Sequence, residues 1–187
     1  AALTWRADEP DRVAARMPPD ALVGRVAGEP WALLPDPFAP GRRAELERAL
    51  RGGRGALGPA VAPGRIGESA RRATLALALA RDGTLVIADE HRLDLVLRSD
   101  PALAEELRTR ALQPLAGLPS GQRERLLETL AAWLDAQGEA RPAAERLHVH
   151  VQTVRYRVGQ LRDLLGDALD DPGGRLELAI ALRLGQA

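Results

Sequence analysis

The chain of 187 residues contains no cysteine, which excludes disulfide bonds, thiol catalysis and metal sites built from thiolates. The same absence fits the reducing cytoplasm, where we expect the protein to reside. Aromatic residues make up 3% of the chain, so its cores must be built from Leu, Ala and Val. No apolar run approaches the ~20 residues that cross a bilayer, so we expect no membrane partner.

Lysine is also absent, since all 26 basic residues are arginine, and 26 acidic residues balance them. Together with the excess of Ala, Gly and Pro, this usage indicates a GC-rich genome rather than a mechanism. The net charge of zero argues against indiscriminate binding of nucleic acid by the whole chain. A local basic face can still bind DNA, because the phosphate field extends over roughly a Debye length, ~10 Å.

The N-terminus does not read as a signal peptide. Residues 1–15 carry Asp8, Glu9 and Asp11 and lack a continuous apolar core. The chain does not begin with Met, which is consistent with a piece of a longer protein that carries a further N-terminal domain.

The first two thirds of the chain alternate between strand and helix patterns. Residues 1–20 are mixed in character, and we expect a leading segment with one short helix. Two apolar runs, Ala21–Ala27 and Pro30–Pro35, are split by Gly28-Glu29, which predicts a β-hairpin. Strands alternating with helices imply a small α/β layer domain over residues 21–116. The further expected elements are strands at Ala56–Ala62 and Thr84–Ala88, and helices at Arg42–Leu50, Ser69–Arg81, Arg92–Leu97 and Pro101–Leu115.

The segment 117–121, Gly-Leu-Pro-Ser-Gly, is the expected linker between domains. Beyond it, residues 122–187 have only helical patterns, so the fold class is an α/β layer domain followed by an all-α domain. Asp171-Pro172 is a typical helix start, with an N-cap and a proline at the first helical position. The expected helices are Gln122–Gln137, Ala143–Leu147, Val151–Leu165 and Arg175–Leu184.

Residues 143–158 predict a helix-turn-helix, in which the second helix enters the DNA major groove. Two steeply crossing helices need a small residue where their backbones approach, and Ala144 supplies it. On the second helix, Val154, Val158 and Leu161 follow the i, i+4, i+7 spacing of an inward face. The turn position often held by glycine is His148, where a positive φ would be strained.

The outward residues of the second helix suit base and phosphate contacts. Gln and Arg make bidentate contacts to adenine and guanine edges, and Thr can meet a phosphate or a thymine methyl. We expect His150 in the N-cap region or at a phosphate, and Arg157 as a flanking phosphate or support residue. Since an arginine-bearing face is often merely solvated, a ligand-sensing or oligomerisation module without DNA binding is the alternative. The residues expected nearest the bases are Gln152, Thr153, Arg155 and Tyr156.

The segment from Leu126 to Leu184 resembles the C-terminal helix-turn-helix domain of PucR/CdaR-type bacterial transcription regulators. The resemblance implies a sequence-specific regulator that partners double-stranded DNA, forms a homodimer and is not an enzyme. It also implies a small-molecule effector acting through a further N-terminal domain. The matching stretches are Leu127–Leu134, Ala143–Leu147, His150–Val158, Leu164–Gly166, Asp171-Pro172 and Leu178–Leu182.

Residues 21–116 resemble the GGDEF-like domain that precedes this helix-turn-helix in the same regulators. The matching stretches are Gly55–Pro59, Ser69–Ala73 and Leu112–Leu115. Diguanylate cyclases carry a Gly-Gly-Asp/Glu-Glu-Phe hairpin that binds metal and substrate, whereas Gly52-Gly53-Arg54-Gly55 holds no acidic residue. The resemblance therefore implies a catalytically inactive domain.

Other patterns have simpler explanations than a site. We expect Gly52–Gly55 to end a helix and form a loop, because it lacks the Lys-Ser/Thr of a P-loop. His148 and His150 have a His-x-His spacing but fall in the expected turn, so we predict no metal and no cofactor. Asp89-Glu90-His91 reads as a solvated loop, since no nucleophile accompanies it.

Overall fold

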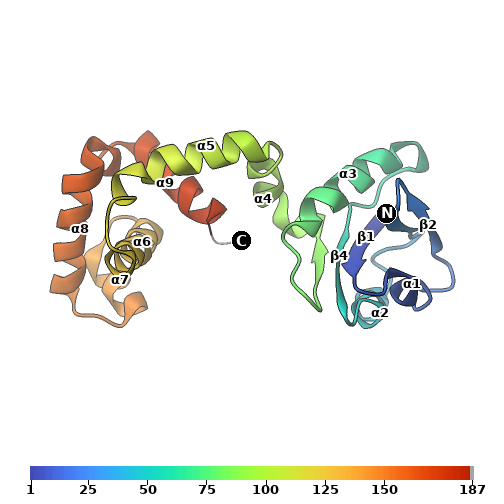
Figure 1. Ribbon diagram of the computed structural model, residues 1–187. Helices are drawn as coiled ribbons and strands as arrows, with labels where there is room; N and C mark the ends of the chain where they lie inside the picture. Colours follow the sequence, from blue (N-terminus) through green and yellow to red (C-terminus); the bar gives the residue numbers. More distant parts are fainter. Residues whose placement is uncertain (186–187) are drawn as a thin grey trace. The chain divides into compact units, whose positions relative to one another are not determined.

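The computed structural model describes residues 1–185 (Figure 1). The chain divides into two compact units, Ala1–Ser99 and Asp100–Ala187. Residues 186 and 187, the end of the expected helical domain, lie outside the described residues. Within the described part, none of the helices combines the length and the apolarity that a bilayer crossing requires.

The N-terminal unit is built on one mixed sheet with the strand order β2-β3-β1-β4-β5. All strand pairs in it are antiparallel except β4 and β5, which are parallel. This unit is the expected α/β layer. Its elements are β1 Ala2–Ala7, α1 Pro10–Ala14, β2 Leu22–Val26, β3 Glu29–Leu33, α2 Arg42–Ala49, β4 Gly53–Leu57, α3 Ile66–Leu77, β5 Leu85–Ile87 and α4 Arg92–Leu97.

The structure confirms the predicted hairpin of β2 and β3. Val26 faces Glu29 across the ladder, so Ala27 and Gly28 form a two-residue turn. Both turn residues have positive φ, 50° at Ala27 and 85° at Gly28. A two-residue turn with positive φ at both positions matches the right-handed twist of the flanking strands, and glycine adopts that conformation without strain.

The expectation of a leading segment over residues 1–20 was wrong for its first part. Residues 2–7 form β1, which pairs with both β3 and β4 inside the sheet. Alternate residues of the strand, Leu3 and Trp5, are completely buried. The strand is central because it has two neighbours, and this long-range pairing is not visible in six residues at a chain end.

The expected loop at residues 52–55 was also wrong. Gly52 has a φ of 83° and ends the turn after α2, but Gly53, Arg54 and Gly55 belong to β4. A Cβ added to Gly53 would lie 2.7 Å from the Cβ of Ala7 and from the Arg6 carbonyl oxygen. Glycine is therefore required here by the close approach of β1, not by a turn.

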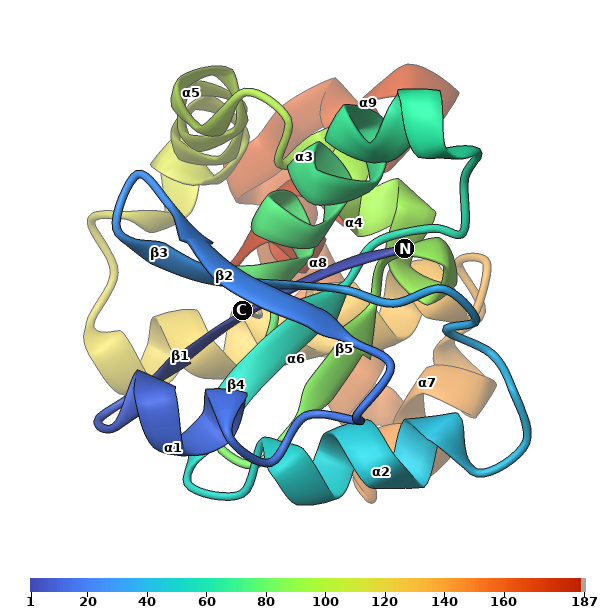
Figure 2. The same ribbon diagram turned by 90° about the vertical axis from the view of Figure 1, so that its right-hand side faces the viewer.

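Two layers of helices cover the two faces of the sheet. Leu85 packs in a cluster with Leu3, Trp5 and residues of α1 and α2. Its neighbour Val86 packs in a second cluster with residues of α3 and α4. Since successive residues of a strand point to opposite faces, α2 and α3 lie on opposite sides of the sheet (Figure 2).

The C-terminal unit is all helical around one core. That core joins Leu112 and Leu115 to Leu130, Trp133 and Leu161. The Asp171 carboxylate accepts a hydrogen bond from the Gly174 amide at 2.7 Å, which confirms the predicted N-cap. The helices are α5 Pro101–Leu112, α6 Ser120–Asp135, α7 Ala140–Leu147, α8 Val151–Leu165 and α9 Pro172–Leu184.

The division between the units lies before α5, not at the expected linker 117–121. Leu107, Ala111 and Leu112 of α5 pack into the core of the helical unit. The segment 117–121 lies inside this unit, since residues 117–119 lead into α6 and Ser120 and Gly121 are its first two residues. The Pro and Gly residues mark a turn between two helices. They do not indicate whether the helix before the turn, α5, packs in the N-terminal or the C-terminal unit.

Candidate nucleic-acid interface

The end of α7 turns through a left-handed residue. The His148 amide donates to the Glu145 carbonyl at 3.3 Å, and the Val149 amide donates to the Ala144 carbonyl at 3.1 Å. This pair of bonds is a Schellman motif, which places the residue after the helix in the left-handed region. His148 occupies that position with a φ of 53° and a ψ of 42°. The positive φ expected for a helix-turn-helix is therefore present without glycine.

His150 caps the start of α8. Its Nδ1 accepts a hydrogen bond from the Gln152 amide at 3.2 Å, and its own backbone is extended. The cap satisfies one of the four amides that a helix leaves unpaired at its N-terminus. The cap therefore fixes the residue at which α8 begins and the direction of its first turn.

The inner face of α8 is locked into the helical core. Val154, Val158 and Leu161 are buried with 4% or less of their surface exposed, as their spacing predicted. Ala144 of α7 is also buried at 4% exposure. Because both α7 and α8 pack on α6 as well as on each other, α8 has a fixed orientation in this unit.

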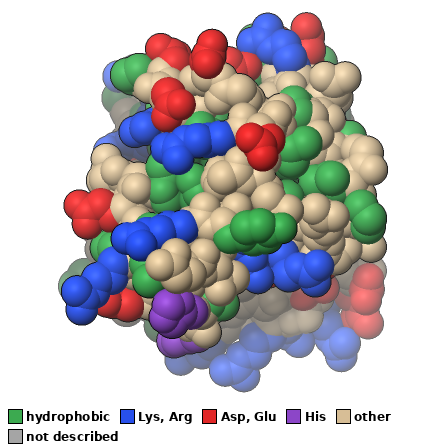
Figure 3. Space-filling model, turned by 90° about the vertical axis from the view of Figure 1, so that its left-hand side faces the viewer, with side chains coloured by type: hydrophobic (Ala, Val, Ile, Leu, Met, Phe, Trp, Pro, Cys, Tyr) green, Lys and Arg blue, Asp and Glu red, His purple; other side chains and the backbone are tan. Residues whose placement is uncertain are grey.

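The outer face of α8 carries polar and aromatic side chains into solvent. Gln152, Arg155 and Tyr156 are exposed, the last with 69% of its surface. Thr153 is half-buried. The Gln160 amide donates to the Tyr156 hydroxyl at 3.4 Å, one helical turn away. Figure 3 shows arginine and histidine side chains across the lower half of the face that carries α8.

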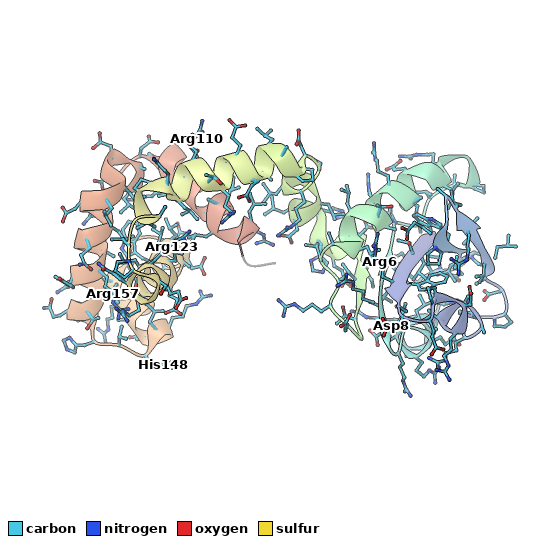
Figure 4. The ribbon with its side chains drawn as sticks, viewed as in Figure 1. Arg6, Asp8, Arg110, Arg123, His148 and Arg157 are labelled. Carbon is cyan, nitrogen blue, oxygen red and sulfur yellow. The ribbon has the colours of Figure 1, made fainter. Side chains whose placement is uncertain are left out.

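Arg157 is turned toward the core rather than outward. Its guanidinium donates to the Thr129 hydroxyl of α6 at 3.2 Å, and that hydroxyl donates to the Arg125 carbonyl at 2.7 Å. Figure 4 shows Arg157 reaching from α8 toward α6. Of the two roles expected from the sequence, support of α8 fits this geometry. Sequence reasoning missed Thr129, a buried hydroxyl one turn after Arg125 on α6.

The nearby arginines differ in their carboxylate partners. Arg146 pairs with Asp135 at 2.8 Å, and Arg141 approaches Glu145 at 3.4 Å. Within residues 1–185, no ion pair holds Arg155. A guanidinium without a carboxylate partner can meet a phosphate or a guanine edge without first breaking an ion pair.

Comparison with known proteins assigns this region. Residues 126–184 match the PucR C-terminal helix-turn-helix domain. The purine catabolism regulatory protein of Bacillus subtilis is 37% identical over 82 residues, which are 43% of this chain and 15% of that protein. An uncharacterized protein of Mycobacterium tuberculosis is 35% identical over 101 residues, 54% of this chain and 23% of that protein. The chain thus spans less than a quarter of these curated relatives.

Two further matches complete the comparison. An uncharacterized protein of Thermomonospora curvata is 40% identical over 90 residues, 48% of each chain. The crystal structure of a regulator of polyketide synthase expression from Bifidobacterium adolescentis covers 99% of this chain and 79% of that chain, at 20% identity and a TM-score of 0.36. The sequence matches and the geometry of α7 and α8 agree: residues 126–184 form a helix-turn-helix domain of the PucR C-terminal type.

Proposed function

We propose that this protein is a sequence-specific DNA-binding transcriptional regulator that places α8 in the major groove. The observation that carries the proposal is that α8 has one buried apolar face and one exposed polar face. One face is locked into the core by Val154, Val158 and Leu161, and the other presents Gln152 and Arg155 to solvent. A helix of 15 residues with this division fits the major groove, which is about 12 Å wide.

The outer residues of α8 have separate roles in this proposal. Gln152 and Arg155 read base edges, because their side chains form bidentate contacts with adenine and guanine. Thr153 and Tyr156 meet the backbone or a thymine methyl. His150 holds the N-terminus of α8 against a phosphate, and Arg157 acts as a positioning residue through Thr129.

A homodimer on a palindromic operator is part of the same proposal. Helix-turn-helix proteins commonly read two half-sites about 34–36 Å apart with two copies of the recognition helix. One α8 contacts too few base pairs to select a single site in a genome. The proposal places the protein in the cytoplasm with the DNA. An effector would act through a further N-terminal domain, and the matched relatives are long enough to contain one.

We further propose that the N-terminal unit is a GGDEF-like domain without enzymatic activity. Its β2–β3 hairpin at Ala27-Gly28-Glu29-Pro30-Trp31, rather than residues 52–55, has glycine, acid and aromatic residues in the order of the Gly-Gly-Asp/Glu-Glu-Phe motif. Proline stands in place of the second acid, and Glu29 is 3.6 Å from the guanidinium of Arg6. Incubation with GTP and Mg²⁺ should give no product, and turnover would refute this part of the proposal.

Selection of bound sequences from a random duplex pool tests the DNA-binding proposal. We expect the wild-type chain to select a palindrome. Arg155→Ala and Gln152→Ala should each weaken binding of that sequence by about 1–3 kcal/mol and relax preference at one base pair of each half-site. Arg48→Ala, at an exposed arginine of α2, is the matched control and should change neither. A folded, dimeric protein that selects no sequence would instead indicate an assembly module.

A further inference from the structure

A cavity of about 560 Å³ lies inside the N-terminal unit, between α3 and α4. Its floor includes Ala88 and Leu95, which belong to the buried cluster on this side of the sheet. Its volume falls within the range of small-molecule sites, about 300–1,000 Å³. The lining residues are Arg71, Arg72, Leu75, Ala88, Arg92, Leu95, Val96 and Ser99.

Two helix faces form the walls, and each combines arginine with apolar side chains. On α3, Leu75 lies one turn after Arg71 and Arg72. On α4, Leu95 and Val96 lie one turn after Arg92. Residues three and four apart share a helix face, so both faces point into the same cavity. The result is an apolar surface flanked by three guanidinium groups.

Positive charge exceeds negative charge around this cavity. The lining contains three arginines and no carboxylate. Glu68 pairs with Arg72 at 2.6 Å and also with Arg65, while Arg92 pairs with Asp89 at 3.2 Å. The pKa of Glu68 is lowered, first by the hydrogen bond from Arg65 and then also by the charges of Arg72 and Arg71. One carboxylate therefore faces three guanidinium groups, those of Arg71 and Arg72 on α3 and that of Arg65 just before it.

The cavity also exposes a large apolar side chain to solvent. Val96 lines the opening with 68% of its surface exposed. A side chain of this type in a concave, positively charged site is typical of a surface that an apolar ligand group covers.

We propose that this cavity binds a small anionic amphiphile, an organic acid whose charged head meets Arg71, Arg72 and Arg92 and whose apolar body covers Leu75, Leu95 and Val96. Guanidinium groups match carboxylate, sulfonate and phosphate oxygens through paired N–H donors. The site and α8 belong to different units, and its occupancy does not rest on the DNA-binding proposal.

A pair of matched fluorescent probes tests the proposal on the full chain. 8-Anilinonaphthalene-1-sulfonate carries the anionic head, and N-phenyl-1-naphthylamine has the same body without it. We expect saturable binding of one sulfonate probe per chain, about tenfold tighter than the neutral probe, which corresponds to about 1.4 kcal/mol. Equal affinity for the two probes would overturn the proposed charge recognition.

Substitutions assign the binding to this cavity. Arg71→Gln with Arg72→Gln should weaken the sulfonate probe about tenfold and leave the neutral probe unchanged. Val96→Glu alters an exposed side chain that the fold does not need, and should also weaken the sulfonate probe at least tenfold. Arg48→Gln on α2, across the sheet, should have no effect. Unchanged sulfonate binding in folded Val96→Glu would overturn the proposal.

Discussion

Replacing His148 by glycine should stabilise the C-terminal unit. His148 holds a φ of 53° at the end of α7, where left-handed backbone costs an L-residue about 1–2 kcal/mol. Glycine removes this cost but loses about 0.4–1 kcal/mol through its greater freedom in the unfolded chain. The two terms leave a net gain between about 0 and 1.6 kcal/mol, and the middle of this range, about 0.8 kcal/mol, raises the melting temperature of a unit of this size by about 3–6 °C.

Thermal unfolding followed by circular dichroism measures this gain. His148→Val should have the opposite sign, because a β-branched residue at positive φ is more strained than histidine. Glu128→Gly, at an exposed position in the middle of α6, is the matched control and should destabilise by about 0.5–1 kcal/mol. If His148→Gly destabilises by as much as this control, the turn does not depend on a left-handed residue and the account of α7 and α8 fails.

Three further predictions concern stability. Arg157→Ala should lower the free energy of unfolding by about 1–2 kcal/mol, because its hydrogen bond to Thr129 is lost. In a chain that already carries Thr129→Val, Arg157→Ala should cost less, and an equal cost in both backgrounds would refute the contact. Gly58→Ala should cost about 3 kcal/mol by urea unfolding, because the new Cβ would lie 2.0 Å from the Ser69 carbonyl oxygen, and a neutral result would contradict that packing. The hydrogen bond from Arg42 lowers the pKa of Asp20. The ionised Asp20 therefore stabilises the fold fully above the ordinary aspartate pKa, and this stabilisation is lost as the pH falls through the lowered pKa. In urea unfolding, the stability of Asp20→Asn should fall less with acid than that of the wild type, and an identical fall would exclude this pair.

The helical unit follows closely from local sequence. The range of α8, Val151–Leu165, is the predicted one, since its inward spacing, its His150 cap and the Gly166 stop all lie within the helix or beside it. The N-cap at Asp171 is equally local. What local sequence left open was the role of Arg157, because the choice between phosphate and support depends on Thr129, which is 28 residues away on another helix.

The N-terminal unit depended more on distant contacts. β1 escaped prediction because its neighbours, β3 and β4, follow far along the chain. Gly53 and Gly55 suggested a loop, but their lack of side chains instead makes room for Ala7 and Leu50. The boundary between the units was predicted too late in the chain for a similar reason. The helix α5 packs on α9, which lies about 70 residues further along the sequence.

The measurement that tests the central claim most directly is a titration of the selected duplex with the wild-type chain and with Arg155→Ala between about 50 and 200 mM salt. The account predicts saturable wild-type binding that weakens steeply with salt. Arg155→Ala should bind more weakly, and its slope should be smaller by up to about 0.9 if Arg155 neutralises a phosphate, or unchanged if it reads only a base. Equal affinities for the two proteins, or no binding by the folded wild-type chain at 50 mM salt, would contradict the assignment of α8 as the recognition helix.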